Sequence, residues 1–371
     1  MKKYILLTGA TGFIGQYVLR RLLAKDVPVV CIARAKGDMT AADRVMDLVK
    51  QFEEAEGREL PKPIVFTGDI TQELLGLDDN ALDWFEANCK AVIHNAASIR
   101  FHAPDNDRTK DPYLSNVNGT QHMLDLCKFA GIEQVFHVST AYITGLREGV
   151  CLETELDEKQ EFANDYQRSK FEAEHMTRGA EHIKSLTVIR PGIVVGDSRD
   201  GSTTAPDFGL YHYIQFTTQV MKMARSGGEE GKVKLNIRLP FVGTEPRNLI
   251  TVDWVADAMV HIIITPELHE NTYHLTPSEA TTSSRIVEAM GNYFNYEGIV
   301  CVGETIPEED RTEFEKLFFD YASQFEVFWG DEPTFDKTNT NAAMADTIPQ
   351  PPLDDECLRK IIRFAVEECF S

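Results

Sequence analysis

The chain has 371 residues, of which 43% are hydrophobic and 26% are charged. That length suits one large domain or two closely joined domains, and the composition is ordinary for a globular protein, which excludes extended disorder. The net charge of −22 predicts no nucleic-acid partner and no binding to anionic membranes.

The cysteines and histidines follow no disulfide or metal-ligand pattern. The seven cysteines are scattered and include no CxxC pair, which is typical of reduced thiols in a cytoplasmic protein. The histidines show no HExxH spacing, so we expect no metal. The sequence has no run of about 18 apolar residues, so we expect no membrane span. Lys2 and Lys3 precede an apolar run as in a signal peptide, but the glycines that follow favour a buried first strand.

Short apolar runs alternate with amphipathic stretches through the first half of the chain. The apolar runs predict strands at 4–8, 27–33, 63–67, 91–94, 134–138 and 186–190. The stretches between them predict helices near 13–25, 41–56, 78–88, 113–130 and 165–184. This alternation indicates a parallel sheet covered on both faces, and right-handed crossovers make it doubly wound. We therefore predict an α/β protein with a Rossmann sheet.

The pattern changes after about Gly192, where a polar loop occupies 196–209. Later stretches predict helices at 211–226, 252–264, 283–293, 309–325 and 354–367, with one strand near 272–276. We expect this half to form a smaller, mostly helical C-terminal lobe.

The segment TGATGFIG (8–15) follows the first predicted strand and opens the first predicted helix. Gly9 permits a tight turn, Gly12 lets the backbone approach a pyrophosphate, and Gly15 permits close packing of helix and strand. The start of the helix supplies free N–H groups for the phosphates. The alternative is a glycine-rich turn without a ligand. We predict a dinucleotide site that contains Gly9, Thr11, Gly12, Phe13, Ile14 and Gly15.

The end of the second predicted strand indicates which dinucleotide is bound. It reads Ala33-Arg34-Ala35-Lys36, without the acidic residue that would hold the ribose of NAD. The planar guanidinium of Arg34 can instead clamp a 2′-phosphate. Solvated loop charges are the alternative for Arg34 and Lys36. We predict NADP(H), with both residues near the phosphate.

Two later strand ends are expected at the same site. Asp69 and Ile70 follow the third strand, where a carboxylate can accept the adenine amino group. Asn95, Ala96 and Ala97 follow the fourth, with small residues where backbone can lie against the cofactor. Carboxyl ends of neighbouring parallel strands share one crevice.

We expect the cofactor domain to be 1–195 with a returning segment near 246–276. The substrate lobe would be 196–245 and 277–371.

Tyr166 and Lys170 lie four residues apart in a predicted helix, so they share one helix face. A nearby ammonium favours the phenolate and lowers the pKa of a tyrosine, which makes Tyr166 a candidate proton donor or acceptor. A solvated helix face is the alternative interpretation.

The motifs together resemble those of extended short-chain dehydrogenases/reductases. They occur in that family's order over roughly residues 4–195, as TGATGFIG, Gly68-Asp69, HNAA (94–97), NVNGT (116–120), HVST (137–140), YQRSK (166–170) and RPG (190–192). A narrower resemblance is to the thioester-reductase-like and fatty acyl-CoA reductase branch, through LLGL (74–77), VSTAYITG (138–145), Asn164, VVGDSRDG (194–201) and RNLI (247–250).

The resemblance implies a role for several further residues. Tyr166 and Lys170 would be the catalytic pair, and Thr140 the third member, with Ser139 as the alternative. Asn116 would help to position the lysine. Further cofactor contacts are implied at Ser139, Tyr166, Lys170, Pro191 and Gly192.

The resemblance also implies an activity, which is NADPH-dependent reduction of an acyl thioester, bound to a carrier protein or CoA, to an aldehyde or alcohol. Polyketide or other secondary-metabolite biosynthesis would be the setting. The alternatives are a reductase of a ketone or hydroxyl of a small metabolite, a nucleotide-sugar epimerase, and a non-catalytic NADP(H)-binding regulator.

Two expectations concern partners. Docking of an acidic carrier protein on this acidic chain would need a local basic patch, for which Arg100, Arg108 and Lys110 are candidates. A homodimer through the helices near 113–130 and 165–184 is implied by the resemblance alone.

Overall fold

The computed structural model describes residues 2–100, 105–225, 231–322, 326, 329–345 and 347–371. The chain divides into two compact units. The first contains Met1–Pro191, Val255–Leu275 and Phe335–Pro349, and the second contains Gly192–Trp254, Thr276–Thr334 and Gln350–Ser371.

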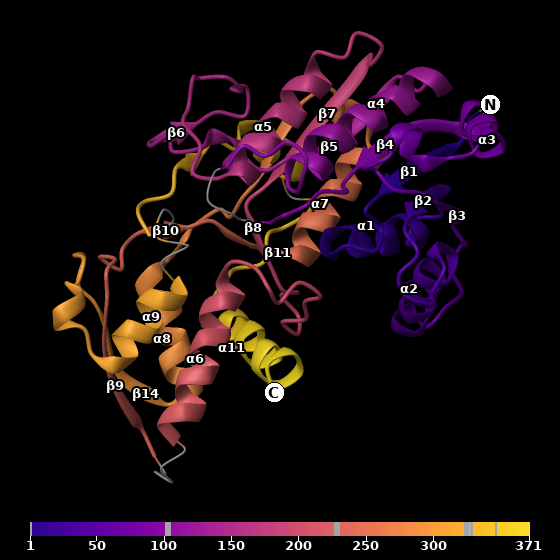
Figure 1. Cartoon of the computed structure of the whole chain (residues 1–371). Helices are drawn as coiled ribbons and strands as arrows, with labels where there is room; N and C mark the ends of the chain where they lie inside the picture. The colour runs from indigo at the N-terminus through magenta and orange to yellow at the C-terminus, as the bar shows by residue number, and fades with distance from the viewer. Residues whose placement is uncertain (1, 101–104, 226–230, 323–325, 327–328, 346) are drawn as a thin grey trace. The chain divides into compact units, whose positions relative to one another are not determined.

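A seven-stranded sheet forms the centre of the first unit (Figure 1). Its strands are β1 (Tyr4–Thr8), β2 (Val29–Ala33), β3 (Ile64–Thr67), β4 (Cys89–His94), β5 (Gln134–Val138), β7 (Ser185–Pro191) and β12 (Thr272–Leu275). They lie in the order β12-β7-β5-β4-β1-β2-β3, and all neighbours are parallel. The direction of winding reverses between β1 and β4, so the loops leaving these two strands diverge from a single point. Doubly wound sheets bind their ligands at such a point.

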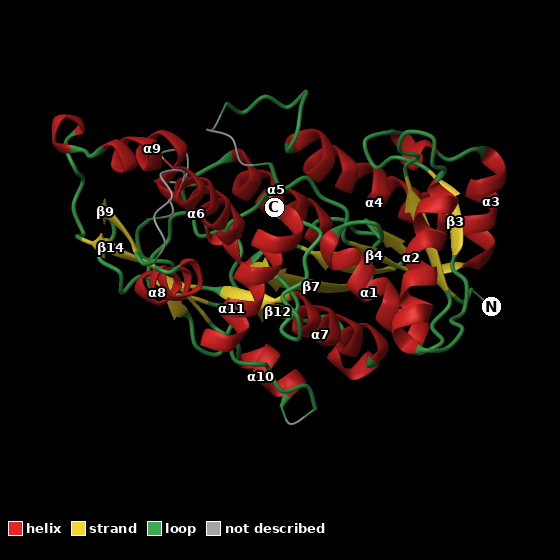
Figure 2. Cartoon of the chain, turned by 90° about the horizontal axis from the view of Figure 1, so that it is seen from below, coloured by secondary structure: helices red, strands yellow, loops and turns green. Residues whose placement is uncertain are grey.

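Helices cover both faces of this sheet, so its central strands are almost wholly apolar. Every residue of β2 is buried, as expected for a strand covered on both sides. Figure 2 shows α3, α4 and α5 on one face and α1 and α7 on the other. The helices are α1 (Phe13–Ala24), α2 (Ala41–Glu56), α3 (Asp79–Asn88), α4 (Gly119–Ala130), α5 (Asp165–Arg178), α7 (Val252–Ile264, whose first turn belongs to the second unit) and α10 (Thr338–Met344).

Shorter elements connect them. Single helical turns occupy Glu73–Gly76, Leu114–Asn118, Ala141–Thr144 and Pro266–Leu268, and β6 (Val150–Cys151) and β15 (Thr334–Phe335) are short strands. The turn at Leu114–Asn118 is π-helical, a geometry that is frequent at functional sites.

A tight turn directs the chain from β2 into α2. Lys36 and Met39 exchange backbone hydrogen bonds of 3.0 and 3.2 Å, and Gly37 between them takes a φ of +57°, which favours glycine. Thr40 then caps α2, because its hydroxyl accepts from the Asp43 N–H while the Asp43 carboxylate accepts from the Thr40 N–H. The first turn of α2 is thereby brought back beside the end of β2.

The second unit is mostly helical and has a core of its own. Its helices are α6 (Leu210–Arg225), α8 (Ser283–Phe294), α9 (Glu313–Ala322) and α11 (Asp355–Phe364), with short turns at Glu308–Asp310 and Ala365–Cys369. Its strands are β8 (Ile193–Val195), β9 (Val233–Leu239), β10 (Pro246–Arg247), β11 (Leu249–Thr251), β13 (Thr281–Thr282) and β14 (Tyr296–Cys301). The core contains Ile214, Leu235, Phe294, Phe318 and Ile361.

The predicted fold class, a Rossmann sheet with a smaller and mostly helical lobe, is confirmed. The structure adds the parallel pair of β9 and β14, which the sequence analysis did not include. It also returns Phe335–Pro349 to the first unit. The assignment of the cofactor to residues 1–195 and 246–276, and of substrate to the rest, stays a prediction. In the described part of the chain, no helix has both the length and the apolar character needed to cross a membrane.

Candidate active site

The glycine loop closes tightly after β1. Gly9 takes a φ of +72°, and a Cβ added to it would lie 2.8 Å from the backbone of Ala96. A Cβ on Gly15 would lie 1.9 Å from the Gly9 carbonyl oxygen. Such distances exclude any side chain, so Gly9 and Gly15 are required for this loop to pack against the start of α1 and the end of β4.

The start of α1 is open to an anion. Its N-cap is Gly12, which offers no side-chain cap, and its first turn contains no acidic residue. The first N–H groups of the helix and its positive dipole end therefore face the loop without a carboxylate to compete. Thr11, Phe13 and Ile14 lie in this loop and first turn, as the sequence predicts.

Arginines gather at the end of β2, as a 2′-phosphate site requires. Arg34 is 70% exposed and lies 3.6 Å from the Asp69 carboxylate. Arg44, in the first turn of α2, donates to the Arg34 carbonyl oxygen at 2.6 Å and to the Thr11 hydroxyl at 3.1 Å. Lys36 is exposed in the turn that follows β2. The structure thus brings Arg34, Asp69 and Thr11 together and adds Arg44, which the sequence analysis missed.

The ends of β3 and β4 lie where the sequence places them. The Thr8 hydroxyl accepts from the N–H groups of Asn95 and Ala96, each at 3.1 Å, which fixes this loop beside Gly9. Ala97 follows and is exposed. Ile70 instead turns partly into the core, where a Cβ on Gly119 would lie 3.0 Å from its Cδ1.

Thr140 and Tyr166 form a hydrogen-bonded pair. Thr140 lies two residues after the end of β5 and is 5% exposed. Tyr166 lies in the first turn of α5, which Asn164 caps by accepting from the Gln167 N–H at 2.9 Å. Burial raises the pKa of Tyr166 to about 12, although the hydrogen bond with Thr140 lowers it. The predicted lowering of this pKa by Lys170 is therefore wrong for the chain by itself, and the phenol keeps its proton at neutral pH.

Lys170 is buried and held by the sheet. Its ammonium donates to the Val138 carbonyl oxygen at 2.7 Å, and the residue is 4% exposed. Burial lowers its pKa to about 8, while the charge of Glu174 raises it. Lys170 therefore titrates near neutral pH, and its protonation state there decides whether a bound ligand meets a positive charge.

Asn116 joins two parts of the site through side-chain hydrogen bonds to Ser98 and Ser169. Its side-chain amide donates to the Ser98 carbonyl oxygen at 3.0 Å and to the Ser169 hydroxyl at 2.9 Å. The Ser98 N–H donates back to it at 2.8 Å. Asn116 therefore fixes the segment after β4 against α5, and its predicted effect on Lys170 stays a prediction.

A hydrogen-bonded chain runs from the glycine loop to Asn116 through His94. The His94 ring contacts the hydroxyls of Thr8 at 3.1 Å and Thr120 at 3.2 Å. Thr120 in turn donates to the Asn116 carbonyl oxygen at 2.6 Å. Burial, with a further effect of Lys170, lowers the pKa of His94 to about 3, so the ring is neutral. His94 belongs to the HNAA motif, but its residue type and position in the sequence indicate no role for the ring.

The remaining predicted contacts lie at the end of β7 and β5. The Ser139 N–H donates to the Ile189 carbonyl oxygen at 2.7 Å. The Thr140 hydroxyl donates to the Pro191 carbonyl oxygen at 3.4 Å. Gly192 begins the second unit, where a Cβ on it would lie 2.7 Å from the Asn248 carbonyl oxygen.

The three candidate docking cations do not form a free basic patch. Arg108 pairs with Glu172 at 2.5 Å, and Lys110 pairs with Asp105 at 2.5 Å. Arg100 is exposed. Within the described residues, no group of three or more His, Cys, Asp or Glu side chains is placed to hold a metal ion.

The residues at the end of β1 and β2 fit a dinucleotide, since they combine a glycine loop, a helix start without a side-chain cap or an acidic residue, and two guanidinium groups. The tyrosine and lysine of α5 and the threonine after β5 stand beside this site in the same unit. Sheet topology and site together define an oxidoreductase of the short-chain dehydrogenase/reductase type, in its extended form. The model of an NAD-binding family, described as "Male sterility protein", matches residues 7–259. The chain belongs to this family, and the predicted resemblance is confirmed.

Several known proteins are similar to the chain. The nonribosomal peptide synthetase asaC of Aspergillus flavus is 26% identical over 306 residues, which span 77% of this chain and 28% of that protein. The aldehyde reductase lnaA of Aspergillus flavus is 26% identical over an alignment 400 residues long. The alignment covers 97% of this chain and 36% of that protein. The chain therefore spans only a minor part of both relatives. The crystal structure of the terminal R domain from the myxalamid PKS-NRPS biosynthetic pathway has a TM-score of 0.78 at 24% identity, covering 100% of this chain and 92% of that one.

Proposed function

We propose that the chain is an NADPH-dependent reductase of acyl thioesters, which releases an aldehyde from an acyl group bound to a carrier protein or CoA. The observation that carries the proposal is the hydrogen-bonded pair of Thr140 and Tyr166 beside a dinucleotide loop. The similarity to a peptide synthetase and to an aldehyde reductase supports a thioester as the substrate and secondary metabolism as the setting.

The cofactor site is proposed residue by residue. The N–H groups at the start of α1 would hold the pyrophosphate, with Gly9 and Gly12 allowing close approach. Arg34 and Arg44 would hold the 2′-phosphate, which supports NADPH over NADH. Lys170 would hold the nicotinamide ribose. When bound, the cofactor supplies the hydride.

The protein supplies the proton and the orientation. Thr140 would donate a hydrogen bond to the thioester carbonyl oxygen, and Tyr166 would protonate the oxyanion that develops there. The raised pKa of Tyr166 suits this direction, because the phenol is fully protonated before reaction. The product of the first reduction is a hemithioacetal. Its C–S bond breaks to give the aldehyde, and the sulfur leaves as a thiol with the hydroxyl proton.

The test is an assay with a synthetic acyl-pantetheine thioester and NADPH. We expect NADPH oxidation in proportion to aldehyde and free thiol, and Tyr166→Phe should reduce the rate by about 10²- to 10⁴-fold, the usual contribution of a general acid. Tyr273→Phe is the matched control, since Tyr273 is buried in the same unit and donates to the Leu268 carbonyl oxygen.

Three outcomes bear on the proposal. Nearly full activity of Tyr166→Phe would show that another group provides the proton. Oxidation of NADPH with ketones but with no thioester would support the small-metabolite reductase instead. Tight NADPH binding without turnover on any carbonyl compound would support a non-catalytic regulator.

A further inference from the structure

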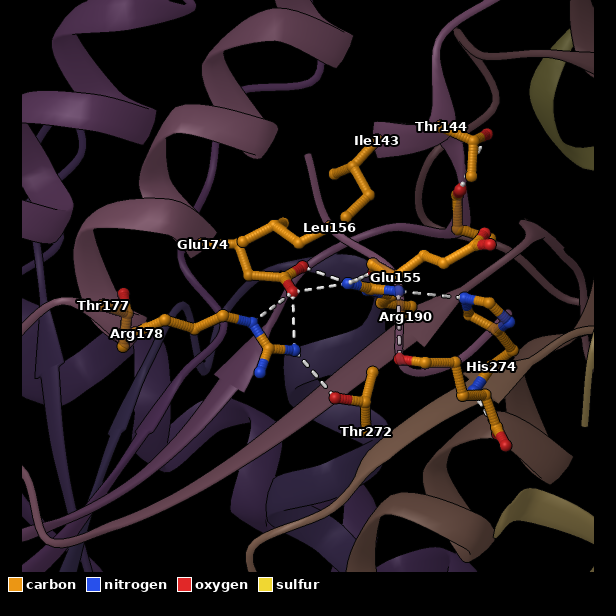
Figure 3. A network of polar contacts seen from close by, with 12 residues as sticks. Ile143, Thr144, Glu155, Leu156, Glu174, Thr177, Arg178, Arg190, Thr272 and His274 are labelled. Atoms are coloured by element: carbon orange, nitrogen blue, oxygen red, sulfur yellow. Dashed lines mark hydrogen bonds and ion pairs between the residues drawn. The ribbon is translucent and has the colours of Figure 1, made fainter. Parts of the chain in front are cut away.

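Arg190, at the end of β7, is fully buried and has an acceptor for each of its guanidinium N–H groups (Figure 3). Two of them form a fork on the Glu174 carboxylate, at 3.1 and 2.6 Å. The others reach the carbonyl oxygens of Glu153 and Glu155 and the His274 ring, at 3.4, 2.8 and 3.2 Å. This side chain is locked in one position by β12, α5 and the segment after β6.

Glu174 is the carboxylate at the centre of this network. It is 0% exposed and also accepts from the Arg178 Nε at 2.9 Å. Although burial raises its pKa, Arg190 and then Arg178 hold it below its usual value, so the group is ionised. A buried ion pair of this kind often stabilises a protein no more than well-packed apolar residues would. Its presence on the catalytic helix therefore calls for another role.

The spacing of residues along α5 indicates what this other role of Glu174 is. Tyr166, Lys170 and Glu174 follow one another at intervals of four along α5, so they share a helix face. The Lys170 ammonium already donates to the Val138 carbonyl oxygen, and the Glu174 carboxylate is occupied by two arginines. The carboxylate therefore acts on Lys170 through space, in a buried setting where charges are weakly screened.

We propose that Glu174 is a positioning residue that acts through Lys170: locked by the buried Arg190, it stabilises the lysine ammonium one helical turn away. One consequence of this inference rests on the proposed function, namely that the charged lysine holds the nicotinamide ribose. The electrostatic effect itself needs no substrate and no cofactor.

Among the groups around Lys170, Glu174 is the one that favours the charged form of the lysine. Tyr166 on α5 is a neutral phenol. His94 on β4 and His137 on β5 are buried, and burial followed by the charge of Lys170 lowers the pKa of both rings. Both histidines are therefore neutral, so they add no positive charge beside the ammonium and supply no negative one.

The test is an NMR titration of the chain labelled with carbon-13 at the lysine Cε atoms. Lys170 is assigned as the signal that is missing from Lys170→Arg. We expect Glu174→Gln to lower the titration midpoint of Lys170 by about one pH unit, as for loss of an opposite charge nearby. Glu174→Asp, which keeps the charge, should restore most of the shift. Glu172→Gln is the control, because Glu172 lies on the same helix but pairs with Arg108 at the surface.

Glu174→Gln leaves Arg190 buried without its partner, so a second variant is needed. Glu174→Gln combined with Arg190→Met removes both charges, and we expect it to fold and to have a lower Lys170 midpoint than Arg190→Met alone. Equal midpoints in these two variants, or a wild-type midpoint in Glu174→Gln, would overturn the proposal. The binding of NADPH is measured in parallel at pH 8. A lowered midpoint with unchanged NADPH affinity would contradict only the proposed contact of Lys170 with the ribose.

Discussion

Tyr166 and Lys170 respond in different ways to the same burial. Burial disfavours the charged form of each group, so the pKa of the phenol rises to about 12 and the pKa of the ammonium falls to about 8. The pair is therefore a protonated acid beside a cation that titrates near neutrality. The spacing of four residues identified the pair, but only the surroundings of the helix decide the direction of each shift.

Arg44 is the residue whose removal tests the choice of dinucleotide. We expect Arg44→Ala to weaken NADPH binding by about tenfold or more, as for loss of a charge-assisted hydrogen bond, and to leave NADH binding almost unchanged. Fluorescence titration with both dinucleotides measures this. Arg58→Ala is the control, since Arg58 is an exposed arginine that donates to the Ala24 carbonyl oxygen. Equal loss for both dinucleotides would mean that Arg44 supports the loop and does not contact the 2′-phosphate.

At the scale of the element, the junction of β1 and α1 depends on Gly15. A methyl group there would lie 1.9 Å from the Gly9 carbonyl oxygen, so α1 would have to move away from the loop. We expect Gly15→Ala to lower the free energy of unfolding by about 1–3 kcal/mol, the usual cost of overpacking, and to abolish NADPH binding. Urea denaturation and fluorescence titration measure the two effects.

Gly179→Ala is the matched control for that change. Gly179 ends α5, and the nearest atom to an added Cβ lies 3.6 Å away. We expect nearly unchanged stability and affinity in this variant. If Gly15→Ala binds NADPH like the wild type, the glycine loop does not hold the pyrophosphate.

At the scale of the whole molecule, low pH lowers the stability of the folded state, because buried histidines such as His274 are neutral in it. Because the His274 Nδ1–H donates to the Asp336 carbonyl oxygen at 2.8 Å, its Nε2 accepts from Arg190. Burial, with Arg190 adding to it, lowers the pKa of His274 from 6.5 to about 4. The unfolded chain therefore binds the extra proton first, and stability is lost as the pH falls from about 6.5 towards 4.

This gives a prediction for the pH dependence of unfolding. Between pH 7 and 5, His274 alone should reduce the free energy of unfolding by about 2 kcal/mol. His274→Gln keeps an acceptor for Arg190 and cannot be protonated, so we expect a smaller loss over the same range. Urea denaturation at both pH values measures this, with His182→Gln, at a half-buried position, as the control. An equal loss in His274→Gln and the wild type would place the acid sensitivity elsewhere.

Surface charge also belongs to this scale. The chain carries a net charge of −22, and two of its three candidate docking cations are paired with carboxylates. Arg108 and Lys110 are therefore not unpaired cations on this acidic chain.

The first half of the fold could be read from the sequence, and the second half only in part. Parallel strands that are buried on both faces appear as continuous apolar runs, so β1 to β5 and β7 were predictable. β9 alternates buried and exposed residues and pairs with β14 only through the packing of the second unit. In the helix predicted at 113–130, the first part is a π-helical turn, which the apolar pattern does not distinguish from an α-helix.

The sequence by itself determined the sheet, the glycine loop and the four-residue spacing of Tyr166 and Lys170, because these depend on local pattern and on residue type. Thr140 was predicted from the family resemblance, and its role stays a prediction. The tertiary structure alone decided which distant groups surround them. Arg44 returns to Arg34 through a tight turn, and Arg190 at the end of β7 contacts Glu174 on α5. Burial raises the pKa of Tyr166 while the hydrogen bond with Thr140 lowers it, and burial lowers the pKa of Lys170 while the charge of Glu174 raises it.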